Sequence, residues 1–175
     1  MGSHSSYYSS LLCSRLRYWK IGSSIIVGRI LSIDYGKKRT GLAVTDPLRI
    51  IASALTTVET KELEKYLADY FSKNDVDIIV LGKPSQMNGQ PSETMRYIEP
   101  LAGRLRHAYP DKQVVLYDER FTSVLAHRTM LESGIGKMAR RDKAVVDRIS
   151  ATIILQSYMD SIEYNADRFK EAFKL

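Results

Sequence analysis

The chain of 175 residues is long enough for one domain with a sizeable core, and its 44% hydrophobic and 26% charged residues are typical of a soluble globular protein. No apolar run approaches the roughly 20 residues needed to cross a membrane, and the single cysteine, Cys13, excludes an intramolecular disulfide. The net charge of +6 falls to +3 without residues 1–27, which carry three basic residues and no acid. Overall charge is therefore only mild support for a nucleic-acid partner.

Residues 1–27 differ in composition from the rest of the chain. They are rich in serine and contain arginine but no acid, which is also the composition of a transit peptide. We favour two interpretations: residues of a tag, or a translation start assigned too far upstream, with the true start near Val27. We expect residues 1–27 to be a non-core extension or tag, residues 28–163 to form the functional domain and residues 164–175 to be a tail.

Three short strands are predicted first. Residues 29–34 form an apolar strand that ends at Asp34, residues 35–39 form a glycine-containing turn, and residues 40–45 form a second strand before the breaker Asp46-Pro47. Residues 50–58 are β-branched and apolar, which predicts a third strand. The short links between these strands predict an antiparallel meander.

Helices and strands alternate in the remainder. Residues 60–73 repeat apolar side chains at helical spacing, with Thr60 as the expected N-cap. A continuous apolar strand over residues 76–81, a helix over 92–107, a strand over 113–117 and helices over 122–131 and 142–158 follow. This order predicts an α/β protein with a mixed five-stranded sheet flanked by helices. It is the order of an RNase H-like fold, although other mixed α/β folds share it.

Three acidic residues stand where such a fold would bring them together. Asp34 ends the first strand, Glu119 follows the last strand, and Asp147 lies in the final helix. Each has an ordinary structural interpretation by itself, namely a turn cap for Asp34, an ion pair with Arg120 for Glu119, and an ion pair with Lys143 or Arg148 for Asp147. The small helical neighbours of Asp147 could let the final helix approach the sheet closely; they are Ala144, Ser150 and Ala151.

Carboxylates that converge repel one another and raise each other's pKa. A cluster of this kind usually binds a hard cation through its oxygens, and Mg²⁺, with Mn²⁺ as a second choice, suits a site that keeps water for a substrate phosphate. Two such ions roughly 3.5–4 Å apart can activate water and stabilise the leaving oxygen in phosphodiester cleavage. The three acids are therefore candidate catalytic and metal-binding residues.

Four ordered segments resemble the motifs of the YqgF (RuvX) family: residues 33–44, 82–89, 118–123 and 146–158. The resemblance covers about residues 28–160. It implies an RNase H-like fold and an acidic site made of Asp34, Glu119 and Asp147. The family is described as Holliday junction resolvases and is also assigned to processing the 5′ end of pre-16S rRNA, so the resemblance implies a nuclease and favours the second substrate.

Basic residues near the three acids could contact phosphates. The candidates are Lys37, Lys38, Arg39, Arg120, Arg140, Arg141 and Lys143. For any one of them, an ordinary solvated surface position is an equally good interpretation. We find no motif that reads base edges, so we expect structured RNA (pre-rRNA) or branched DNA to be bound mostly through its backbone and shape.

Several alternatives remain open at this stage. Junction cleavage normally needs a two-fold dimer, and the sequence is compatible with a monomer or a homodimer, in the cytoplasm and without a membrane partner. The turn from Asp34 to Gly41 also resembles the first phosphate loop of actin-like kinases, but 175 residues leave no room for the second domain that encloses ATP. A third alternative is a non-catalytic nucleic-acid scaffold, against which the three intact acids argue.

Overall fold

The computed structural model describes residues 19–21, 24–26, 28–83, 94–118 and 142–173, with side chains from residue 28 to residue 163 within those ranges. Its strands are β1 Trp19–Ile21, β2 Ser24–Ile26, β3 Arg29–Tyr35, β4 Arg39–Thr45, β5 Ala52–Glu59, β6 Val76–Lys83 and β7 Gln113–Asp118. Its helical elements are the 3-10 turn η1 Thr60–Glu62 and the α-helices α2 Leu63–Lys73, α3 Met95–Ala108 and α5 Lys143–Phe173.

Strands β3 to β7 form one five-stranded sheet in the order β5-β4-β3-β6-β7. The pairs β3–β4 and β4–β5 are antiparallel, whereas β6 is parallel to both β3 and β7. The predicted meander and the predicted mixed five-stranded α/β sheet are therefore confirmed. The central strand β3 separates the antiparallel half of the sheet from the parallel half.

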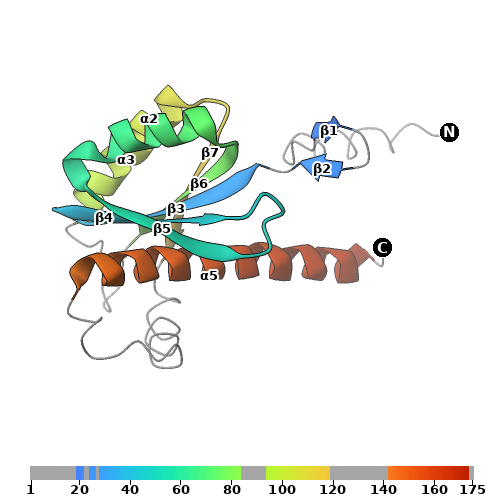
Figure 1. Cartoon of the computed structure of the whole chain (residues 1–175). Coiled ribbons are helices and arrows are strands. Elements are labelled where there is room, and N and C mark those ends of the chain that lie inside the picture. Colours follow the sequence, from blue (N-terminus) through green and yellow to red (C-terminus); the bar gives the residue numbers. More distant parts are fainter. Residues whose placement is uncertain (1–18, 22–23, 27, 84–93, 119–141, 174–175) are drawn as a thin grey trace.

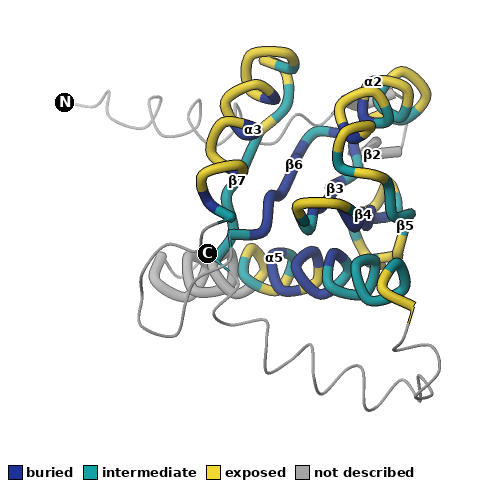
Figure 2. The backbone as a smooth tube through the Cα atoms, turned by 90° about the vertical axis from the view of Figure 1, so that its left-hand side faces the viewer, coloured by how far each residue is buried: buried dark blue, intermediate teal, exposed yellow. Residues whose placement is uncertain are grey.

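Helices cover both faces of this sheet (Figure 1). Helices α2 and α3 lie on one face, where their apolar side chains join a core with alternate residues of β3, including Leu31 and Ile33. Helix α5 lies across the other face, where a second core joins Ile30 to Ala151 and Leu155. Figure 2 shows that the middle of α5 and most of β6 are buried. The alternation along β3 is the period of two that a strand buried on both sides must have.

Some local predictions differ from the structure. Thr60 is not the N-cap of α2, which begins after Glu62 and has no side-chain cap. Helix α5 continues to Phe173, well past the expected end at Tyr158. Strands β1 and β2 pair in antiparallel fashion within residues 1–27, which we expected to be a non-core extension or tag. The predicted helix over 122–131 lies outside the described residues, and the three predicted domain boundaries stay predictions.

Among the described residues, no helix combines the length and the apolar character that a membrane crossing requires.

Candidate active site

The alternation of β3 decides which face Asp34 occupies. Ser32 faces α5, because its hydroxyl donates a hydrogen bond of 2.7 Å to the carbonyl oxygen of Ala151. Asp34 is two residues further along the same strand and therefore lies on the α5 face as well. Its neighbours Ile33 and Tyr35 pack on the opposite face, toward α2 and α3. The first predicted acid thus lies at the carboxyl end of the central strand, on the face that α5 covers.

Gly41 allows α5 to come down onto the sheet beside Asp34. Gly41 is the cross-strand partner of Asp34 in the β3–β4 ladder, so any side chain at position 41 would lie on the same face as the Asp34 carboxyl. A Cβ at this position would overlap the backbone carbonyl of Asp147. Because Gly41 has no side chain, the backbone of Asp147 can lie directly against β4, beside Asp34.

Two hydroxyl groups of the sheet hold α5 in this position. Besides Ser32, Thr57 of β5 donates a hydrogen bond of 2.7 Å to the carbonyl oxygen of Ala144. Thr57 is the partner of Gly41 in the β4–β5 ladder, so Thr57, Gly41 and Asp34 form one row across three strands. The residues Ala144 and Ala151 that accept these bonds are the small helical neighbours of Asp147 that predicted a close approach. That prediction is confirmed.

The surroundings of Asp34 disfavour the ionised form of its carboxyl group. Burial, and secondarily the negative charge of Asp147, raise the pKa of Asp34 from 3.8 to about 6. The structure therefore brings two of the three predicted acids within electrostatic reach of each other. A raised carboxyl pKa that arises from both burial and a like charge is typical of functional sites, because packing alone does not require it.

Arg39, the first residue of β4, holds Asp147 through an ion pair. Its Nε donates a hydrogen bond of 3.0 Å to Oδ2 of Asp147, and 39% of the Arg39 side chain and 25% of the Asp147 side chain are exposed. The structure gives Arg39 a carboxylate partner through Nε, and the predicted contact of Arg39 with phosphate stays a prediction. This pair fixes one carboxylate oxygen of Asp147 and leaves Oδ1 without a bond to Arg39.

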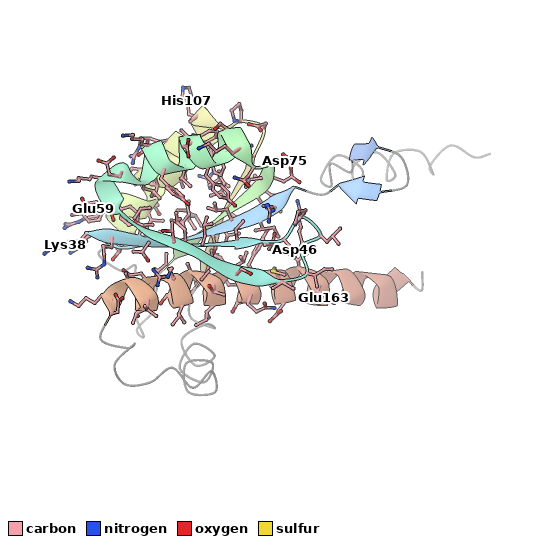
Figure 3. All side chains as sticks on the ribbon, viewed as in Figure 1. Lys38, Asp46, Glu59, Asp75, His107 and Glu163 are labelled. Atoms are coloured by element: carbon pink, nitrogen blue, oxygen red, sulfur yellow. The ribbon has the colours of Figure 1, made fainter. Side chains whose placement is uncertain are left out.

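The turn between β3 and β4 presents Lys37 and Lys38, both exposed, at the same end of the sheet. Thr60 holds this turn: its hydroxyl donates to the carbonyl oxygen of Gly36 at 2.6 Å, and its backbone N–H donates to the carbonyl oxygen of Lys38 at 3.1 Å. Figure 3 shows Lys38 and Glu59 at this end of the molecule and Asp46 at the opposite end. Thr60 was expected to cap a helix, and its role is to anchor the basic turn.

The remaining predicted residues divide into two groups. Lys143 is exposed at the first position of α5. Glu119, Arg120, Arg140 and Arg141 lie outside the described residues, so their predicted roles stay predictions. Over the described part of the chain, no group of three or more acidic, histidine or cysteine side chains is placed to hold a metal ion. That part contributes two carboxylates, Asp34 and Asp147.

A known protein family matches most of the chain. The family model described as "RuvX: Holliday junction resolvase" matches residues 28–161. The chain belongs to the RuvX family. The predicted resemblance is thus confirmed, and the acids Asp34 and Asp147 both lie within the part of the chain that the RuvX model matches.

The RuvX relatives include three proteins that carry the name "Putative pre-16S rRNA nuclease". The Porphyromonas gingivalis protein is 59% identical over 135 residues, which is 77% of this chain and 98% of the relative. The Parabacteroides distasonis and Phocaeicola vulgatus proteins are 53% and 56% identical over 138 residues, 79% of this chain and 99% of each relative. Among solved structures, YeaZ from Pseudomonas aeruginosa matches at a TM-score of 0.38 and 19% identity, over 62% of this chain and 50% of that one.

We predicted no positioning role at this site for three residues, one of which, Thr60, was expected to cap a helix instead. Gly41 and Thr57 position α5 and Thr60 positions the basic turn. Gly41 carried a signal, since a glycine in the middle of a strand often marks the close approach of another backbone. Thr57 and Thr60 carried no signal of these contacts, because the partner of a threonine hydroxyl depends on the tertiary structure.

Proposed function

We propose that this RuvX-family chain is a metal-dependent nuclease that hydrolyses phosphodiester bonds in processing the 5′ end of pre-16S rRNA, in the cytoplasm. Family membership supports a nucleic-acid hydrolase. The names of relatives that are 53–59% identical, and that the chain matches over nearly their whole length, support the rRNA substrate.

The juxtaposition of Asp34 and Asp147 carries this proposal. Burying one carboxyl beside another weakens the folded state at neutral pH, because the ionised form is disfavoured there. Such an arrangement is expected where the carboxylate oxygens bind a cation that offsets their repulsion. Both side chains offer the oxygen ligands that Mg²⁺ or Mn²⁺ accepts, so the residues present fit the proposed ion, with Glu119 as a further proposed ligand.

Bound there, the ion would supply a Lewis acid for a phosphoryl oxygen and a water of lowered pKa. The other charged residues of the site would orient a metal-binding carboxylate or attract the substrate phosphates. Arg39 holds Asp147 through Oδ2, which fixes the direction in which Oδ1 is presented. Lys37 and Lys38 on the anchored turn, and Lys143 at the start of α5, would bind substrate phosphates.

A cleavage assay tests the proposal. The full chain is incubated with an rRNA precursor that retains its 5′ extension, in Mg²⁺, in Mn²⁺ and in a chelator. We expect cleavage that depends on the divalent ion and that Asp34→Asn abolishes. Asp69→Asn is the matched control, because Asp69 is an exposed aspartate of α2 paired with Lys73, and this variant should cleave like the parent chain. Undiminished cleavage by folded Asp34→Asn would refute the assignment of the site.

Junction resolution is the second candidate, and the description of the matching family model favours it. A four-way DNA junction is cut symmetrically by a two-fold dimer, so this function requires a homodimer, whereas rRNA cleavage also suits a monomer. Incubation with a four-way junction, together with the mass of the chain in solution by light scattering, separates the two candidates. Paired symmetric nicks made by a dimer, with the rRNA precursor left intact, would favour junction resolution.

A further inference from the structure

One large aromatic side chain is exposed on α3, close to the proposed active site. Tyr97 is 38% exposed. Helix α3 buries a stripe of five residues against the sheet, namely Met95, Ile98, Leu101, Ala102 and Leu105, and Tyr97 is not among them. The Tyr97 ring therefore lies outside this buried stripe, and part of it is open to a ligand.

The ring of Tyr97 lies against the ring of Tyr35. The two ring centroids are 6.5 Å apart and the ring planes differ by 25°, so the rings are stacked and not edge to face. Tyr35 is the last residue of β3 and follows Asp34 directly. Because successive strand residues point to opposite faces, the tyrosine stack and the acidic pair lie on opposite sides of one strand end. A nucleic-acid strand that passes over this end can reach both.

Basic side chains lie near the stack. The guanidinium carbon of Arg96 lies 4.9 Å from the centroid of the Tyr97 ring, and Arg96 is itself exposed. The guanidinium lies over the ring, so a base that stacks on this face takes the place of the flexible Arg96 side chain. The first turn of α3 contains no acidic residue, and Tyr35 leads into the turn that carries Lys37 and Lys38. Aromatic rings beside cations that can hold phosphates are the components of a single-strand binding site.

We propose that Tyr35, Tyr97 and Arg96 form a stacking site for one unpaired base of the nucleic acid that the acidic pair cleaves. This inference rests on the proposed nuclease function and adds a requirement to it. A base inside a duplex has both faces covered by its neighbours and cannot stack on a protein ring, whereas an unpaired base can. The substrate must therefore contain an unpaired nucleotide next to the cleaved bond. A precursor rRNA end meets this requirement and a fully paired duplex arm does not.

The test measures binding and not cleavage. The full chain is titrated, in a chelator, against a fluorescent single-stranded RNA of about 12 nucleotides and against the same sequence as a blunt duplex. Tyr97→Leu keeps an apolar side chain but removes the ring, and Tyr97→Phe keeps the ring. We expect Tyr97→Leu to weaken single-strand binding by about tenfold, within the range measured for base–aromatic stacks, with duplex affinity unchanged. Tyr97→Phe should bind both RNAs like the parent chain.

A second measurement does not depend on how well the leucine variant folds. Single-stranded RNA that carries 2-aminopurine should lose fluorescence when the parent chain or Tyr97→Phe binds it, because stacking quenches this base. Unquenched 2-aminopurine in the bound complex at every position along the RNA would overturn the proposal. Equal loss of single-strand and duplex affinity in Tyr97→Leu would overturn it too.

The outcome separates this inference from the proposed function. Quenching and the single-strand preference without any cleavage of the rRNA precursor would count against the nuclease assignment alone. Cleavage of the precursor by a Tyr97→Leu variant that binds single strands like the parent chain would count against the stacking site alone.

Discussion

The strand residue Gly41 lies directly beneath the backbone of Asp147, at a position where any Cβ would overlap the Asp147 carbonyl. Because Gly41 is also the cross-strand partner of Asp34, this contact sets how near the two carboxylates come to each other. The close approach of the two carboxylates therefore depends on Gly41, which takes no part in the chemistry and acts only through its lack of a side chain.

Replacing Gly41 with alanine should separate the acidic pair. The added methyl group must push α5 away from β4, which we expect to lower the free energy of unfolding by about 1–3 kcal/mol, as overpacking of a core does. A displacement of about 1 Å at a catalytic group can cost about a hundredfold in rate, so cleavage should fall by about that factor. Urea unfolding and the cleavage rate measure the two effects.

Gly103→Ala is the control for that variant. Gly103 lies on the exposed side of α3, and a Cβ there has no atom within 4 Å beyond its chain neighbours and the local helix backbone. In a helix interior, alanine is favoured over glycine by roughly 0.5–1 kcal/mol, so this variant should gain stability and keep full activity. A Gly41→Ala protein as stable and active as Gly103→Ala would show that α5 is not seated on Gly41.

Replacing Asp34 with asparagine should stabilise the protein while abolishing cleavage. Its pKa is raised to about 6 in the folded state from an ordinary 3.8. Between these pH values the folded protein binds more protons than the unfolded chain, so stability falls as pH rises through this window and stays lower above it. At about 1.4 kcal/mol per pKa unit, Asp34 lowers the free energy of unfolding of the metal-free protein by about 2–3 kcal/mol at pH 7.

Urea unfolding in a chelator at several pH values measures this effect. Asp34→Asn should exceed the parent chain in stability by about 2–3 kcal/mol at pH 7, and the difference should vanish below about pH 4. Asp69→Asn, at an exposed position, should show no such gain. A difference that stays constant across this pH range would mean that Asp34 is not the carboxyl with the raised pKa.

Removing the Arg39 guanidinium should affect catalysis more than stability. The pair with Asp147 is partly exposed, and such pairs contribute little, typically below about 1 kcal/mol. Arg39→Gln, however, frees Asp147 to rotate, and we expect the cleavage rate to fall by about tenfold or more. Arg104→Gln is the matched control, because Arg104 pairs with Glu64 on an exposed surface. Equal rates for the two variants would rule out an orienting role for Arg39.

Loss of the Thr60 hydroxyl should loosen the basic turn. Thr60→Val removes the bond to the carbonyl oxygen of Gly36 and leaves the Thr40 hydroxyl without this partner. We expect faster hydrogen exchange over residues 36–39 and weaker binding of nucleic acid, since Lys37 and Lys38 lose their fixed position. Thr60→Ser keeps the hydroxyl and should restore both properties. Unchanged exchange in Thr60→Val would show that the turn is held by other contacts.

The local pattern of the sequence was sufficient to predict the layers of the fold. Residues 29–34 and 76–81 are short apolar runs between breakers, and they form the central strands β3 and β6. The short links before residue 60 predicted the antiparallel meander, because chains with few connecting residues must turn back on themselves. These features follow from periodicity and chain connectivity, which the sequence contains directly.

The sequence by itself thus determined that an aspartate ends the central strand, that another lies among small residues in the final helix, and that the chain belongs to the RuvX family. Tertiary structure alone decided that Gly41 seats α5, that Arg39 binds Asp147 and that Tyr97 stacks on Tyr35. These contacts join residues from different elements, and which pairs meet depends on strand register and helix placement. Strand register and helix placement cannot be predicted from residue spacing along one segment, because the packing of the whole sheet against its helices sets them.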